Sequence, residues 1–117
     1  MSNLTEAVRR GDIVLVDFGT KDGAEQSGIR PAVVVQNDTG NKYSPTAIVC
    51  PMTTKTKREI TTHVLLGPKD GTDKLSILLC EQISTVDKTK FIKKLGKIER
   101  EKIEEVNRAV RISLGLE

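Results

Sequence analysis

The sequence lacks tryptophan and has two cysteines, one histidine and few aromatic residues of any kind. Long apolar runs are also missing, since runs such as Ile13 to Val16 and Ile77 to Cys80 are far shorter than the ~18 residues that a membrane span requires. The first ten residues carry charges without a continuous apolar stretch behind them, which is not the pattern of a secretory signal. We therefore expect a cytoplasmic protein, and a length of 117 residues predicts a single domain covering residues 1–117.

Cys50 and Cys80 each lie inside an apolar run, where a small buried thiol is expected rather than a ligand or a nucleophile. The histidine and the cysteines have no zinc-site spacing, and the acidic residues do not form a calcium-loop pattern. The sequence thus predicts no metal and no other cofactor.

The charge balance is mildly positive, with 19 Lys and Arg against 16 Asp and Glu. This balance permits an anionic partner without requiring one. Five lysines and no acid lie between Lys88 and Lys97, and four acids follow between Glu99 and Glu105. Such runs favour a solvated face balanced by its neighbour, with a phosphate-attracting surface as the second interpretation. The aromatic residues Phe18, Tyr43 and Phe91 are too few for the stacking platforms of common single-strand binders.

Short β-branched runs separated by turn residues predict a series of strands and hence a small barrel or sandwich. The expected strands are Asp12 to Phe18, Pro31 to Gln36, Thr46 to Met52, Thr61 to Leu66 and Leu75 to Leu79. Ala32 to Val35 and Ala47 to Cys50 are apolar without alternation, so both belong to central strands with two covered faces. The segment between them, Asn37 to Ser44, is rich in residues that favour turns and is expected to be a loop.

The C-terminal segment has a helical period. Apolar residues recur every three or four positions between Glu99 and Leu114, as one face of a helix requires, and Gly115 is placed to end that helix. The preceding segment, Phe91 to Ile98, is compatible with either a helix or a strand.

Arg30 ends a polar loop, and Pro31 biases it toward extended geometry at the start of a strand. A guanidinium there can bind a phosphate through two hydrogen bonds. The alternative is an ordinary ion pair with a carboxylate such as Glu25, which the spacing alone favours.

The stretch Thr53 to Thr62 combines hydroxyls with the cations Lys55, Lys57 and Arg58. It is too polar for a core and suits phosphate and ribose, although an exposed loop has the same composition. His63 follows in an expected strand, where a lone histidine is more often a packed or surface residue than a general base.

Five motifs follow one another along the chain: Gly11 to Val14 (GDIV), Arg30 to Val35 (RPAVVV), Ser44 to Val49 (SPTAIV), Pro51 to Thr53 (PMT) and Glu81 to Lys88 (EQISTVDK). In this order they resemble the MazF/PemK family of toxin endoribonucleases, closest to the branch of Gram-positive chromosomal toxins. The resemblance extends from about Gly11 to the C-terminus. The resemblance implies a mainly β, SH3-like small barrel with a C-terminal helix, assembled as a homodimer. For residues 91–98 it favours a strand after a short helical turn.

The family's activity is cleavage of single-stranded mRNA without a metal, in which the ribose 2′-OH attacks the adjacent phosphate and leaves a cyclic phosphate and a 5′-OH. The catalytic pair of the branch matches Arg30 and Thr53. The resemblance further implies RNA contacts at Glu25, Gln26 and Gln82, with Glu25 as a candidate base and the two amides as readers of base edges. Its implied partner is an antitoxin with an acidic, largely disordered tail.

The plasmid-borne branch of the family uses other catalytic positions, and those positions are occupied here by Ala24, Leu79 and Glu81. Only the Arg30 and Thr53 mechanism can therefore be transferred. Ser84 also departs from the family, which usually has a basic residue at that position.

Two other functions fit the same fold class. A DNA gyrase poison of the CcdB type relies on a terminal Trp-Gly-Ile, whereas this chain ends in residues 114–117 as Leu-Gly-Leu-Glu and has no tryptophan. A non-catalytic SH3-like binding module would give no reason for the Arg30 and Thr53 motifs to occur together.

Overall fold

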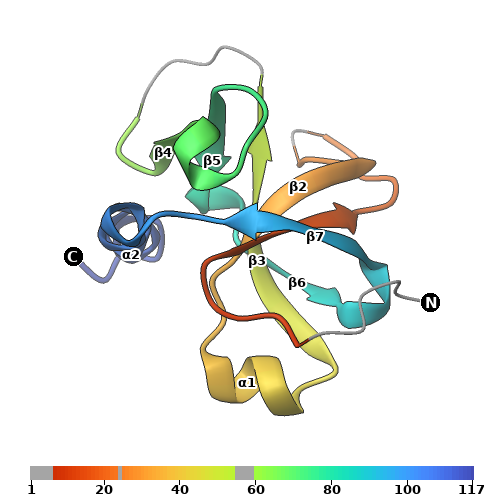
Figure 1. Ribbon diagram of the computed structural model, residues 1–117. Coiled ribbons are helices and arrows are strands. Elements are labelled where there is room, and N and C mark those ends of the chain that lie inside the picture. Colours follow the sequence, from red (N-terminus) through yellow and green to blue (C-terminus); the bar gives the residue numbers. More distant parts are fainter. Residues whose placement is uncertain (1–6, 24, 55–59) are drawn as a thin grey trace.

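The computed structural model describes residues 7–23, 25–54 and 60–117. Figure 1 shows strands curling around a small interior, with one long helix at the side. The strands are β1 (Asp12–Asp17), β2 (Ile29–Val34), β3 (Thr46–Thr53), β4 (His63–Leu66), β5 (Ser76–Leu79), β6 (Ser84–Asp87) and β7 (Phe91–Lys97). The helices are α1 (Asp38–Tyr43) and α2 (Arg100–Ser113), and the 3₁₀ turns are η1 (Pro68–Asp70), η2 (Cys80–Gln82) and η3 (Lys88–Lys90).

All strand pairs are antiparallel, in the order β4-β5-β3-β2-β1-β7, with β6 also pairing with β3. Strand β3 is long enough to have three neighbours. Its first half pairs with β6 over Thr46–Val49, its last two residues pair with β5, and β2 lies along its other edge. The sheet bends at this strand into a small barrel, which confirms the expected fold class.

Side chains that alternate along β1, β2 and β3 divide the apolar core into two clusters. One set points into the barrel, and the other points toward α2 and the β4–β5 hairpin. The barrel cluster contains Val14, Val16, Ala32, Val34, Ala47, Val49 and Phe91. The outer cluster contains Ile13, Val33, Cys50, Met52, Leu66, Leu78, Cys80, Val106 and Ala109. Both faces of the central strands are therefore covered, as their apolar runs predict.

Helix α2 confirms the C-terminal prediction to within one residue at each end, because Glu99 and Leu114 are its caps. It packs on β4 and η2 through Val106 and Ala109, which are buried. Gly115 has a φ of 72° and donates its N–H to the carbonyl of Ile112, so it ends the helix in a left-handed conformation that glycine adopts readily.

Several elements differ from the sequence prediction: β6 was not predicted, and β4 begins at His63 rather than at Thr61. Residues 38–43, expected as loop, form α1, which begins because the Asn37 side chain accepts a hydrogen bond from the Gly40 N–H at 2.8 Å. Strand β2 begins at Ile29, two residues before the predicted Pro31. The segment 91–97 is a strand that follows the short turn η3, which confirms the expectation drawn from the family resemblance.

The two cysteines are fully buried and unbridged, as predicted. The neighbouring Cys80 thiol and burial both raise the pKa of Cys50, so this thiol stays protonated. Among the described residues, no helix has the length and apolar content needed to cross a bilayer.

Candidate functional site

A cavity of about 330 Å³ opens between the β1–β2 loop and η2. Three of the five sequence-predicted site residues line it: Glu25, Gln26 and Gln82. The remaining described lining residues are Phe18, Lys21, Pro51, Glu81, Ile83 and Ser84. The Gln26 backbone N–H donates to Gln82 Oε1 at 2.9 Å, so a bond between positions far apart in sequence joins the loop to η2.

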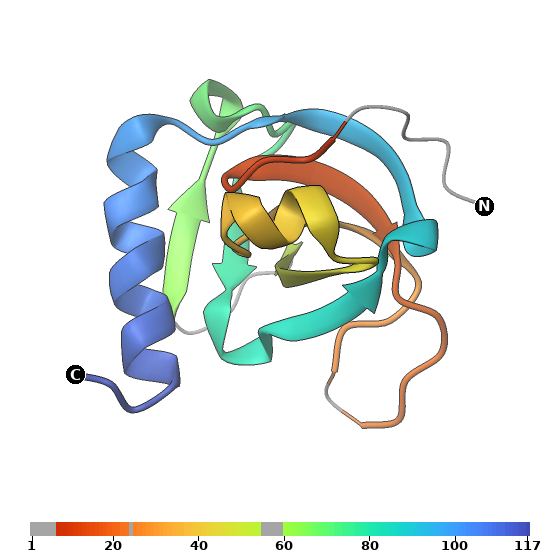
Figure 2. The ribbon, with the colours of Figure 1, turned by 90° about the horizontal axis from the view of Figure 1, so that it is seen from below.

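The β1–β2 loop has a narrow neck that directs its tip toward this cavity. Phe18 N–H donates to Gly28 O at 2.9 Å, and Gly28 N–H donates to Gly19 O at 2.8 Å. Gly19 and Gly28 have φ values of 70° and 76°, a region that side-chain-bearing residues rarely adopt. Figure 2 shows the loop reaching outward on the side of the barrel opposite α2.

Arg30 is the second residue of β2 and pairs with Val16 of β1, so it lies at the start of a strand as predicted. Its Nε donates to the carbonyl of Ser27 at 2.7 Å, which turns the half-buried guanidinium back toward the loop. The alternative ion pair with Glu25 does not form within the described residues. Within the part of the chain that the structure describes, the terminal nitrogens of the guanidinium make no side-chain or backbone hydrogen bond, so both can bind a ligand.

Thr53 is the last residue of β3 and is only 3% exposed. The expectation that residues 53–62 are too polar for the core is therefore wrong for Thr53, because it pairs with Ile77 of β5. The cations Lys55, Lys57 and Arg58 lie outside the described residues.

Strand register places Arg30 and Thr53 on the same face of the sheet. The β2–β3 ladder ends with Ala32 opposite Pro51, and Arg30 and Thr53 each lie two residues beyond that last pair. Since side chains alternate, both residues are on the face to which Pro51 belongs, and Pro51 lines the cavity. The catalytic pair implied by the family resemblance therefore shares the face of Pro51, but neither residue is among those that line the cavity with Glu25, Gln26 and Gln82.

Glu81 is a lining residue to which the sequence analysis assigned no role. Its Oε1 accepts from the Thr62 hydroxyl at 3.0 Å, and its Oε2 is 3.3 Å from His63 Nε2. The signals in the sequence were that Glu81 directly precedes Gln82 and that it stands at a position that the plasmid-borne branch of the family uses in catalysis. Ser84 also lines the cavity, where its small side chain stands in place of the basic residue usual in the family.

The lysine-rich segment is partly engaged by the fold. Lys88 donates to the carbonyl of Asn41, and Lys94 pairs with the buried carboxylate of Asp12 at 3.3 Å. In the acidic run that follows, Glu105 pairs with Lys102 at 3.3 Å. These contacts favour the interpretation as a balanced, solvated face.

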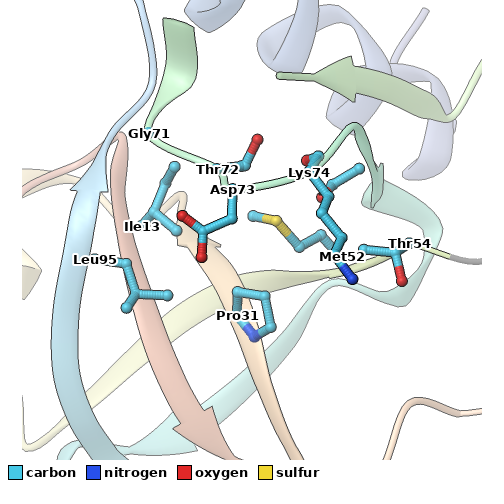
Figure 3. A pocket seen from close by; sticks show the side chains of 10 residues that line it. Ile13, Pro31, Met52, Thr54, Gly71, Thr72, Asp73, Lys74 and Leu95 are labelled. Atoms are coloured by element: carbon cyan, nitrogen blue, oxygen red, sulfur yellow. The ribbon is translucent and has the colours of Figure 1, made fainter. Parts of the chain in front are cut away.

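A second cavity of about 280 Å³ lies on the opposite face of β2 and β3 (Figure 3). Pro31 and Met52 form part of its apolar floor, and Asp73 and Lys74 add polar groups. None of the predicted site residues lines it. We therefore place the candidate site at the first cavity.

Comparison with known proteins gives a consistent result. Residues 9–114 match the model of a family described as PemK-like, MazF-like toxin of type II toxin-antitoxin system. Over 111 residues the chain is 50% identical to "Endoribonuclease MazF" of Staphylococcus saprophyticus. The aligned region covers 93% of this chain and 92% of that relative.

Solved structures agree in fold. An endoribonuclease in complex with its cognate antitoxin, from a mycobacterial species, has a TM-score of 0.82 at 27% identity and covers 95% of this chain and 98% of its own. MazF from Deinococcus radiodurans has a TM-score of 0.82 at 23% identity and covers 94% of this chain and 98% of its own.

Proposed function

The chain belongs to the family of PemK-like, MazF-like toxins of type II toxin–antitoxin systems, and on that premise we propose that it is an endoribonuclease that cleaves single-stranded mRNA in the cytoplasm. The observation that carries the proposal is the 50% identity to an endoribonuclease MazF over nearly the whole chain. The cavity supports it, because Glu25, Gln26 and Gln82 line it together and Arg30 and Thr53 lie on the adjoining strand ends.

In the proposed reaction the ribose 2′-oxygen attacks the adjacent phosphorus, and the bond to the 5′-oxygen breaks. The products are a 2′,3′-cyclic phosphate, or the 3′-phosphate after its hydrolysis, and a 5′-OH. Arg30 stays protonated, so its role is to bind the scissile phosphate and stabilise the charge of the pentavalent transition state. Thr53 has a neutral hydroxyl that donates to a phosphate oxygen or relays a proton to the leaving 5′-oxygen.

The remaining residues suit the ribose and the bases. Glu25 is exposed on the loop and lines the cavity, so we assign it as the base that removes the 2′ proton. Gln26 Oε1 is buried and has no hydrogen-bond partner within the described residues, which suits an acceptor for a base-edge N–H. Gln82 is oriented by its bond from the Gln26 N–H and serves as the second reader.

We further propose that residues 1–117 act as one toxin domain and assemble as a homodimer. Large apolar side chains are exposed at Ile29 (60%), Leu65 (43%), Leu75 (66%) and Leu116 (70%), and a second copy would cover part of this surface. The partner that blocks the RNA site would be an antitoxin with an acidic tail. The exposed lysines of β7 offer that tail a complementary charge.

The test is incubation of the purified, folded chain with a long single-stranded RNA in EDTA, with the new 5′ ends mapped by primer extension. Discrete cuts that end in 5′-OH groups are expected. An absence of cuts over several kilobases of varied RNA would refute the proposal. Inhibition of DNA gyrase by the same preparation would then favour the gyrase poison, and no effect in either assay would favour a binding module.

A further inference from the structure

The carboxylate of Glu81 is held in one orientation by groups from the start of β4. Thr62 and His63 each direct a donor at a different oxygen, at 3.0 and 3.3 Å. Because an ionised carboxylate can only accept, the hydrogen of the imidazole must be on Nε2. Each oxygen keeps a further lone-pair site, and the Glu81 side chain is 36% exposed.

The His63 ring is largely buried and contacts Glu81 through Nε2, while its Nδ1 has no hydrogen-bond partner within the described residues. Its side chain is 6% exposed, and it lines a cavity between β4 and α2 together with Glu105, Arg108 and Ala109. The pairing of β4 with β5 places His63 opposite Leu79, which ends β5 just before η2. The Glu81 carboxylate therefore belongs to the rigid frame of the fold, whereas Glu25 belongs to a loop.

The charges around the candidate site indicate what it binds. Its described lining has two carboxylates, Glu25 and Glu81, and a single cation, Lys21. A phosphate would meet net negative charge there, whereas the amino and ring N–H groups of a base would meet acceptors. A base edge therefore suits this cavity, and the scissile phosphate suits the guanidinium of Arg30 outside its described lining.

We propose that Glu81 is a specificity-determining residue that accepts hydrogen bonds from the amino-bearing edge of one substrate base, and that Thr62 and His63 are its positioning residues. This inference rests on the proposed endoribonuclease activity. Cytosine, adenine and guanine present amino donors, whereas uracil presents carbonyl oxygens on either side of one N–H. Glu81 should therefore select an amino-bearing base and reject uracil at one position of the cleavage site.

The decisive experiment deletes the amino group from the RNA as well as the carboxylate from the protein. The wild-type chain first cuts a randomised RNA library to define its preferred site. Short substrates are then made in which each adenine or cytosine of that site is replaced by the analogue without the amino group, purine or 2-pyrimidinone. If guanine is the preferred base, inosine replaces it. At one position the deletion should slow wild-type cleavage ~10- to 100-fold, and Glu81→Leu, whose side chain has no acceptor, should be insensitive to the same deletion.

The positioning residues are tested by conservative rescue. His63→Leu should lose most of the discrimination at that position, and His63→Gln, whose amide can still donate, should restore it. Thr62→Val should give an intermediate loss. Glu105→Gln is the matched control, because this acid lines the neighbouring α2 cavity and should leave the base preference unchanged.

The outcomes separate the two proposals. A folded wild-type chain that does not cut RNA refutes the proposed function. If it cuts, and either no amino deletion slows cleavage or Glu81→Leu keeps the full wild-type sensitivity, only the assignment of Glu81 is refuted. The substrate series uses the wild-type protein, so its result stands even if one of the variants fails to fold.

Discussion

Replacement of Arg30 by lysine and by alanine separates the charge of the guanidinium from its geometry. Lysine keeps a positive charge but loses the Nε donation to Ser27 O, which at 2.7 Å fixes the orientation of the planar group. It also replaces a two-pronged contact with phosphate by a single point charge. One charge-assisted hydrogen bond contributes ~1.5–3 kcal/mol, and since each 1.36 kcal/mol is tenfold in rate, Arg30→Lys should cut about 10- to 150-fold more slowly.

Arg30→Ala removes both phosphate contacts and the charge, so the loss should be at least about 10²- to 10⁴-fold by the same arithmetic. The measurement is single-turnover cleavage of a short RNA that contains the mapped site. Circular dichroism and light scattering establish that each variant is folded and has the same assembly state as the wild type. Arg100→Ala, at the exposed start of α2, is the control.

The result that refutes this reasoning is a folded Arg30→Ala chain with a cleavage rate within about threefold of the wild type, against the losses expected above. Arg30 would then have no part in the mechanism. A lysine variant as fast as the wild type would show that the charge alone suffices and that the orientation by Ser27 has no role.

Three further predictions concern the fold. Asp70 is buried and accepts from the N–H groups of Gly67 and Glu99, both at 3.1 Å. Asp70→Asn should lower the free energy of unfolding by about 1–3 kcal/mol in urea denaturation, because one of these donors loses its acceptor; an unchanged midpoint would contradict this. The Cys50 thiol, with its raised pKa, should resist alkylation at pH 8 in the native chain and react once the chain is unfolded in urea. The backbone N–H of Arg10, followed by Asn41, lowers the pKa of Asp38, so its stabilising contribution is present above pH ~4 and is lost as the pH falls through the folded-state value. The stability difference between the wild type and Asp38→Asn should therefore shrink between pH 5 and pH 3, and a difference that grows there would show that the sign is wrong.

Much of the fold was predictable because it depends on local patterns. The apolar runs in β2 and β3 indicated strands covered on both faces, and the period of residues 99–114 indicated α2. Strand β6 was not predicted, since its sequence STVD has a single apolar residue and its pairing with β3 provides the order. Helix α1 was missed because the turn-forming composition of residues 38–43 outweighed the cap at Asn37.

The candidate site was predictable only in part, for a related reason. Arg30 precedes Pro31 and Thr53 lies two residues after Pro51, each in a recognisable motif, and Gln82 follows in another. The orientation of the Glu81 carboxylate depends on its contact with His63. That contact exists only because β4 pairs with β5 before the chain turns at η2. The spacing of residues in the sequence does not indicate which strands pair, so this contact could not be predicted from it. The bond from Gln26 to Gln82 likewise depends on the tertiary fold.

The neck of the β1–β2 loop has a consequence for how this protein can change over evolutionary time. The backbone bonds between Phe18, Gly19 and Gly28 close the loop on itself, so the residues inside it can be substituted or lengthened without altering the strands on either side. Arg30 and Thr53 belong to those strands, whereas Glu25 and Gln26 belong to the loop. Exchange of this one loop would therefore replace the proposed base Glu25 and the reader Gln26 together, while Arg30 and Thr53 on the strands and Glu81 and Gln82 on η2 stay in place.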